Sequence, residues 1–237
     1  KLCSIFLAAA VLAGLLAAPV YAAPSAGGLS AFADVADYAP GTFSDVSAES
    51  WYADGVRTVC QKGIMNGVGG GRFDPSEPIT WTQAVVIAAR LHSTYHGRSL
   101  EQSDQSWHFP ARAYAYEHRL ISSGRFWGPW PDAAPITRQE MAQLFRNVLD
   151  SADLPAVNDA ALTDLDAIAP DFRPAVEELC AAGIFTGRDN GKFDPEGTAT
   201  RAETAVIVSR LLDPGQRVSR DLRVPRSLRE WGGNFYN

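Results

Sequence analysis

Residues 176–211 read VEELCAAGIFTGRDNGKFDPEGTATRAETAVIVSRL, and residues 56–91 read VRTVCQKGIMNGVGGGRFDPSEPITWTQAVVIAARL. The two stretches align without a gap at an offset of 120 residues. The offset is fixed by identical pairs: Cys60 and Cys180, Gly63 and Gly183, Phe73 and Phe193, Thr80 and Thr200, Leu91 and Leu211. Self-similarity at a fixed spacing is typical of repeat architectures, so it governs the interpretation of the rest of the chain.

A weaker middle copy lies 57 residues after the first. Its matching positions are Phe109, Ile121, Gly124, Ile136, Thr137 and Val148, which follow Tyr52, Ile64, Gly67, Ile79, Thr80 and Leu91. It has Leu120 in place of the helix-ending glycine, and Trp130-Pro131-Asp132 in place of Phe-Asp-Pro. We therefore predict three copies: copy one over 43–96, a diverged copy two over 104–150, and copy three over 160–213.

Each copy carries the signals of two helices joined by a turn. Gly63 and Gly183 can adopt the left-handed conformation that ends a helix. The second helix is expected to begin at Thr80, Thr137 and Thr200, because each is followed three residues later by Gln83, Glu140 or Glu203, which is the capping-box pattern. The predicted fold class is all-α, built from helix-turn-helix repeats.

Arg138 and Arg201 occupy the first position of the second helix in copies two and three. A cation there is unfavourable by roughly 0.3–1 kcal/mol, because the helix dipole is positive at that end. An anion held jointly by the arginine and the exposed amides of the helix start would offset this cost. A surface ion pair with a nearby carboxylate would offset it equally well, and spacing alone leaves both interpretations open.

The two ends of the chain differ in composition from the repeats. Lys1 precedes an apolar run that ends near Pro19, so residues 1–22 are predicted to be a cleaved export signal, after which no membrane-spanning segment is expected. Residues 23–42 are rich in Ala, Gly, Ser and Pro and predict a flexible leader. The tail over 214–237 carries an arginine at every third position from 217 to 229 and is interpreted as a solvated tail, the alternative being extra attraction to an anionic wall polymer or lipid surface.

Several classes of function are disfavoured by the sequence. A net charge of -6 disfavours nucleic-acid binding. The pair His92 and His96 lacks a third metal ligand at motif spacing, so neither a metal site nor a cofactor is expected. Cys60 and Cys180 are predicted to be buried small apolar side chains. No catalytic motif is recognised, which favours a protein that is not an enzyme.

At these residues the chain resembles the S-layer homology (SLH) family. Copy one shows Phe43-Ser44-Asp45-Val46, Trp51, Gly63-Ile64-Met65-Asn66-Gly67 and Ile79-Thr80. Copy three shows Thr163-Asp164-Leu165, Gly183-Ile184-Phe185-Thr186-Gly187 and Thr200-Arg201-Ala202-Glu203. The resemblance covers residues 43–213, and the motifs are specific as a set at fixed offsets. Asp45 and Asp164 are expected to cap or brace the first helix.

The resemblance implies a pseudo-threefold helical bundle whose inter-repeat grooves bind an anionic secondary cell-wall polysaccharide, often one that carries ketal pyruvate. It assigns anion contact to Arg138 and Arg201. Copy one has Trp81 at that position, so its groove is expected to be altered or lost, and Trp81 could stack on a sugar or simply pack. Asp189, Asn190 and Gly191 are further candidate ligands, or only a turn that requires positive φ.

The predicted function is therefore non-covalent anchoring of a secreted protein at the cell wall or S-layer of a bacterium. The alternative is an envelope assembly or adhesion protein that binds another protein through the same grooves. The sequence carries no signal for an oligomeric state.

Overall fold

The computed structural model describes residues 27–101, 107–121, 133–159, 162–188 and 191–219. Within these ranges the regular elements are α-helices and short 3-10 turns, with isolated β-bridges but no strand. The α-helices are α1 (Ala53–Gln61), α2 (Trp81–Tyr95), α3 (Phe109–Glu117), α5 (Arg138–Arg146), α6 (Arg173–Ala181) and α7 (Arg201–Leu212). The all-α prediction is confirmed.

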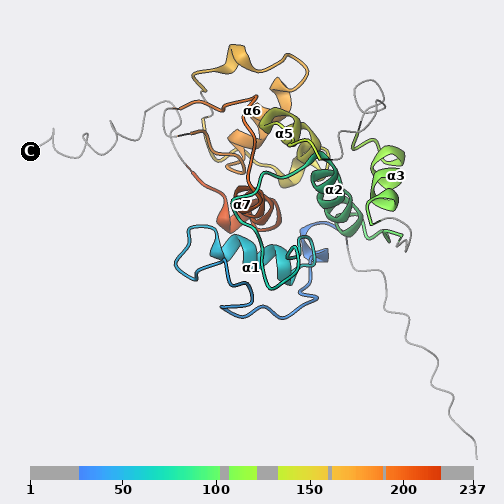
Figure 1. Cartoon of the computed structure of the whole chain (residues 1–237). Coiled ribbons are helices and arrows are strands. Elements are labelled where there is room, and N and C mark those ends of the chain that lie inside the picture. The colour runs from blue at the N-terminus through green and yellow to red at the C-terminus, as the bar shows by residue number, and fades with distance from the viewer. Residues whose placement is uncertain (1–26, 102–106, 122–132, 160–161, 189–190, 220–237) are drawn as a thin grey trace, which may run out of the picture.

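The helices pair between copies rather than within them (Figure 1). The first helix of copy two, α3, packs on the second helix of copy one, α2; likewise α6 of copy three packs on α5 of copy two. The pairing of α1 with α7 closes the series, because it joins the first copy to the last. The result is the predicted pseudo-threefold bundle, in which every copy is completed by its neighbours.

A ring of backbone contacts lies where the second helices begin. The β-bridges join Thr80 to Pro135, Thr137 to Thr198, and Thr200 to Pro78. Each bridge therefore connects the N-cap of one copy to the segment before the N-cap of the next copy, in cyclic order. These bridges use the backbone groups of the segment, which would otherwise be unpaired at the centre of the molecule.

Local sequence signals set the helix ends as expected. Capping boxes are present at Thr80, Thr137 and Thr200. Gly63 has φ 68°, its amide donates to the Cys60 carbonyl, and the Ile64 amide donates to the Val59 carbonyl. This is the hydrogen-bond pattern of a helix that ends through a left-handed glycine, and Gly183 repeats it in copy three.

Some of the described residues at both ends of the chain contact the bundle. Phe32 is buried, Lys62 Nζ donates to its carbonyl at 2.8 Å, and the Val35 amide donates to the Gln61 carbonyl. Phe32 therefore adds to the core from within the segment expected to be a flexible leader, whereas residues 33–37 of that segment are exposed. Arg217 of the predicted tail donates to the Asp153 carbonyl at 2.7 Å. The predicted signal over 1–22 lies outside the described residues, and none of the described helices has the length and apolar character needed to cross a bilayer.

Candidate functional site: the arginines between copies

Arg138 and Arg201 reach from the start of one copy's second helix into the turn of another copy. Arg201 Nε donates to the Phe73 carbonyl at 2.7 Å and its Nη2 to the Asn66 carbonyl at 2.8 Å, both in copy one. Arg138 makes the same pair of bonds to copy three, to the Phe193 carbonyl at 2.8 Å and the Thr186 carbonyl at 3.2 Å. The arginines are therefore structural links between copies, and they are only 4% and 7% exposed.

An aromatic ring lies under each guanidinium group. The Arg201 guanidinium carbon lies 4.6 Å from the centroid of the Phe73 ring, and that of Arg138 lies 4.9 Å from the centroid of the Phe193 ring. Burial lowers the pKa of both arginines, although an arginine remains charged at any ordinary pH. The carbonyl oxygens and ring faces thus stabilise two buried cations.

The amides of the helix starts are already hydrogen-bonded by the protein. The Arg201 and Ala202 amides donate to the Glu77 and Pro75 carbonyls at 2.8 and 3.0 Å. The Arg138 and Gln139 amides donate to the Gly197 and Pro195 carbonyls at 2.8 and 3.1 Å. This corrects the expectation of exposed helix-start amides: backbone carbonyls of the adjacent copy, not an anion, offset the helix dipole there.

Each arginine is linked to an aspartate through one peptide group. Asp45 accepts from the amides of Phe73 and Asp74, both at 2.8 Å, and the carbonyl of the Phe73–Asp74 peptide accepts from Arg201. In copy three, Asp164 accepts from the Phe193 and Asp194 amides. Both aspartates therefore hold the Phe-Asp-Pro turn rather than cap the first helix, because that turn bends its amides toward them.

An open cleft of about 470 Å³ lies beside Arg201. Its walls include Asn66, Gly67 and Val68 of the copy-one turn, Gln83 and Arg90 of α2, Trp107, and Arg201 itself. Arg90 donates to the Ile64 carbonyl at 2.9 Å, and Trp107 is 63% exposed. Within the described part of the chain, Arg201 Nη1 makes no hydrogen bond. The cleft can therefore offer two cations and an aromatic face to a ligand; we call it the Arg201 cleft.

The position of this cleft corrects the expectation for copy one. The groove of copy one was expected to be altered because copy one lacks the helix-start arginine. In the structure the arginine in that groove comes from copy three, so the groove of copy one retains one. The helix start of copy one meets copy two instead, since the Trp81 amide donates to the Ala134 carbonyl at 3.0 Å. The tryptophan that replaces the arginine in copy one therefore lies at the contact with copy two and not in the groove of copy one.

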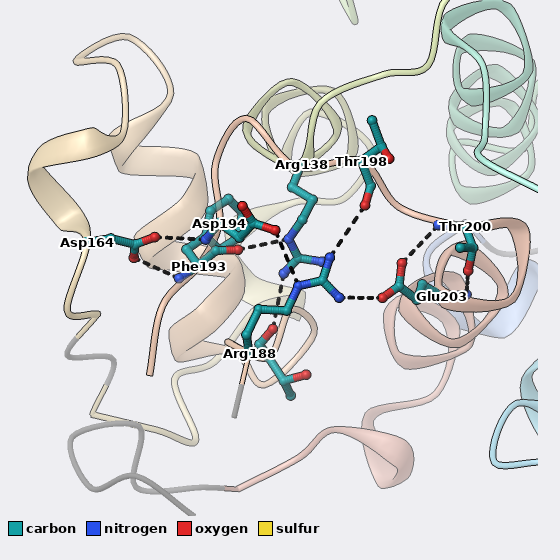
Figure 2. Close-up of polar contacts among 9 residues, drawn as sticks. Arg138, Asp164, Arg188, Phe193, Asp194, Thr198, Thr200 and Glu203 are labelled. Carbon is teal, nitrogen blue, oxygen red and sulfur yellow. Dashed lines mark hydrogen bonds and ion pairs between the residues drawn. The ribbon is translucent and has the colours of Figure 1, made fainter. Parts of the chain in front are cut away.

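The region around Arg138, which we call the Arg138 groove because it is the equivalent of the Arg201 cleft, holds a second arginine. Figure 2 shows Arg188 beside Arg138. Arg188 Nη1 lies 2.6 Å from a Glu203 carboxylate oxygen, and its Nε lies 3.5 Å from an Asp194 carboxylate oxygen. Copy one has Val68 and Gln83 at the positions equivalent to Arg188 and Glu203. The two grooves are thus built alike but differ in charge.

The other predicted site residues have different positions. Trp81 is only 8% exposed and belongs to the core, so the packing interpretation is the one that the geometry supports. Gly191 has φ 77°, and its amide donates to the Arg188 carbonyl at 2.9 Å, as a turn requires. Asp189 and Asn190 lie outside the described residues. Sequence reasoning missed Arg90 and Trp107 as cleft residues, although Arg90 and Arg210 are repeated at the same 120-residue offset.

The described cysteines and histidines form no metal site or disulfide. Cys60 and Cys180 are free thiols, and burial raises the pKa of Cys60 to about 11. His92 of α2 contacts α3, because its Nδ1 lies 2.9 Å from the Tyr114 hydroxyl. In the described ranges, no group of three or more His, Cys, Asp or Glu side chains is arranged to hold a metal ion.

Comparison with known proteins identifies the repeat. The family model of the S-layer homology domain matches residues 42–80 and 161–205. These ranges fall on copies one and three, and they include both turns that receive an arginine.

Several relatives share most of this chain. An amylopullulanase of Thermoanaerobacterium thermosulfurigenes is 26% identical over 73% of this chain and 10% of its own length. An S-layer protein of Bacillus thuringiensis subsp. finitimus is 28% identical over 71% of this chain and 21% of its own length. A cellulosome-anchoring protein of Acetivibrio thermocellus is 27% identical, over 64% and 36% respectively. The chain therefore spans only a minor part of each of these relatives.

Proposed function

Because the chain belongs to the S-layer homology domain family, we propose that it anchors a protein at the cell surface by binding an anionic, pyruvylated secondary cell-wall polysaccharide without a covalent bond. The family match and the S-layer relatives indicate a secreted protein that is associated with the cell wall. They also point to an anchoring rather than a catalytic role for the matched regions.

The observation that carries the proposal is the Arg201 cleft. Arg201 and Arg90 supply two positive charges in a chain whose net charge is -6, so attraction for an anion is local rather than general. A ketal pyruvate presents a carboxylate, which a guanidinium group can bind through charge-assisted hydrogen bonds. The exposed Trp107 indole offers an apolar face on which a sugar ring could stack.

The test is sedimentation with purified bacterial cell walls that carry a pyruvylated polymer, before and after chemical removal of the ketal pyruvate. The wild-type chain should bind the untreated walls and lose binding to the treated ones. Unchanged binding to treated walls would contradict the proposal and favour a protein or other partner in the groove.

Arg201→Lys tests the residue assignment, because it keeps the charge while removing the forked donor geometry. Losing a hydrogen bond to a charged group costs roughly 1.5–3 kcal/mol, so wall affinity should fall about tenfold or more. Arg57→Lys is the matched control, since Arg57 is exposed on α1 and pairs only with Asp54 among the described groups. Thermal unfolding of each variant shows whether the fold is kept.

A further inference from the structure

We propose that Arg188 and the carboxylates it pairs with block the Arg138 groove, so that the anionic polymer binds the Arg201 cleft in preference to the Arg138 groove. This inference rests on the proposed function and specifies which groove performs it. It follows from a comparison of two grooves that share one architecture within one chain.

The shared architecture comes first. In both grooves a buried arginine donates to the carbonyl of the turn phenylalanine, Phe193 or Phe73, through Nε. In both, an arginine of the second helix donates to an isoleucine carbonyl: Arg210 to Ile184 at 3.2 Å and Arg90 to Ile64 at 2.9 Å. The basic framework is therefore the same.

The difference lies in what stands next to the buried arginine. In the Arg138 groove, Arg188 pairs with the Glu203 and Asp194 carboxylates, and its Nη2 also lies 3.5 Å from the Thr198 carbonyl oxygen (Figure 2). In the Arg201 cleft the equivalent of Arg188 is Val68 and the equivalent of Glu203 is the neutral Gln83. Asp74, the equivalent of Asp194, pairs with Arg72 at 3.0 Å, but neither of these residues is among the described walls of that cleft.

Both components of the ion pair act against an incoming anion. Glu203 keeps a negative charge beside the place where the carboxylate of the polymer would bind, and like charges repel. Arg188 already directs its donors at that glutamate, so the ligand would have to displace a carboxylate that belongs to the protein. Glu203 cannot easily move away, because its carboxylate also accepts from the Thr200 amide at 2.9 Å in the capping box.

The primary test is Arg188→Val combined with Glu203→Gln, which gives the groove both residues found in copy one. Removing Arg188 alone would leave the Glu203 carboxylate unpaired and still repelling an anion. The probe is a labelled methyl glycoside that carries a 4,6-O-pyruvate ketal, and saturation is measured by equilibrium dialysis. We expect wild type to saturate at a single site, and the double variant to double the bound probe at saturation. The gain is diagnostic because the double variant leaves the net charge unchanged, so a general change in attraction predicts no difference. Arg57→Val combined with Asp54→Asn removes an exposed ion pair from α1 and should change nothing.

The converse variant is Val68→Arg combined with Gln83→Glu, which transfers the ion pair to the Arg201 cleft. Glutamate completes the capping box in copies two and three, so the helix start should tolerate it. We expect the bound probe to fall at least tenfold. A double variant that bound no more probe than wild type, or two equal sites in wild type, would overturn the inference while leaving the proposed function intact. A wild-type chain that bound neither the probe nor pyruvylated walls would overturn both.

Discussion

At the scale of single residues, the structure depends on short polar contacts that join segments far apart in the sequence. Asp164 accepts from the Phe193 and Asp194 amides at 2.7 and 2.8 Å, and the Phe193 carbonyl accepts from Arg138. A carboxylate and a guanidinium group thus bind opposite ends of one peptide group. Copy one repeats the arrangement with Asp45, whose burial opposes ionisation; the Phe73 and Asp74 amides outweigh this and lower its pKa.

Replacing Asp45 should therefore weaken the fold. Asp45→Ala leaves two amides without their acceptor. Because an unsatisfied buried donor costs about 1–3 kcal/mol, we expect the free energy of unfolding to fall by a total within that range. Asp45→Asn keeps one acceptor oxygen and should cost less. Chemical denaturation measures both, with Asp37→Ala as the control because Asp37 is exposed. If Asp45→Ala were as stable as the control, the turn would not depend on this carboxylate.

The capping boxes and the aspartates show how far sequence reasoning reaches at this scale. Thr80, Thr137 and Thr200 were predicted correctly, because the partner of each lies three residues away and the pattern is local. Asp45 and Asp164 were assigned to the wrong element, because their partners lie 28 to 30 residues away. Spacing along a helix says nothing about such contacts.

At the scale of helices, the α2–α3 contact differs from the other two pairs in its histidines. The His92 ring centroid lies 4.1 Å from that of His96 and 5.5 Å from that of His118, and Arg98 Nη1 lies 2.6 Å from His118 Nδ1. Burial, followed by the proximity of His96, His118 and Arg98, lowers the pKa of His92 to about 4. His92 is therefore neutral in the folded protein near neutral pH.

This interface should weaken in acid. Because the folded-state pKa of His92 lies below the ordinary histidine value of about 6.5, protonation favours the unfolded state. The stability that neutral His92 contributes to the fold is fully present above about pH 6.5 and is lost as the pH falls toward 4. The melting temperature of wild type should therefore drop more between pH 7 and pH 5 than that of His92→Gln, which can still hydrogen-bond Tyr114. If the melting temperatures of the two proteins fell equally between pH 7 and pH 5, His92 would not be the cause of the acid sensitivity.

At the scale of the whole molecule, the copies form a closed ring. Self-similarity in the sequence predicted the copies and the all-α class, since both follow from patterns within one copy. It did not predict that α1 packs on α7 or that Arg201 serves the groove of copy one, because an alignment shows which residues are equivalent and not which copies touch. The error about the copy-one groove arose from assuming that each arginine stays within its own copy.

Ring closure predicts that no single copy is stable alone. A fragment of residues 27–101 contains α1 and α2 but lacks α7, α3 and α5, which cover them in the intact chain. Its apolar helix faces would remain in water, and short isolated helices are marginal without tertiary packing. We expect this fragment to show little helix by circular dichroism, and to regain it on mixing with a fragment of residues 107–219 as an equimolar complex seen by size-exclusion chromatography. The intact chain provides the reference spectrum. A fragment 27–101 that unfolded cooperatively by itself would mean that each copy folds independently and that the contacts between copies, including the Arg201 link, are secondary to the fold.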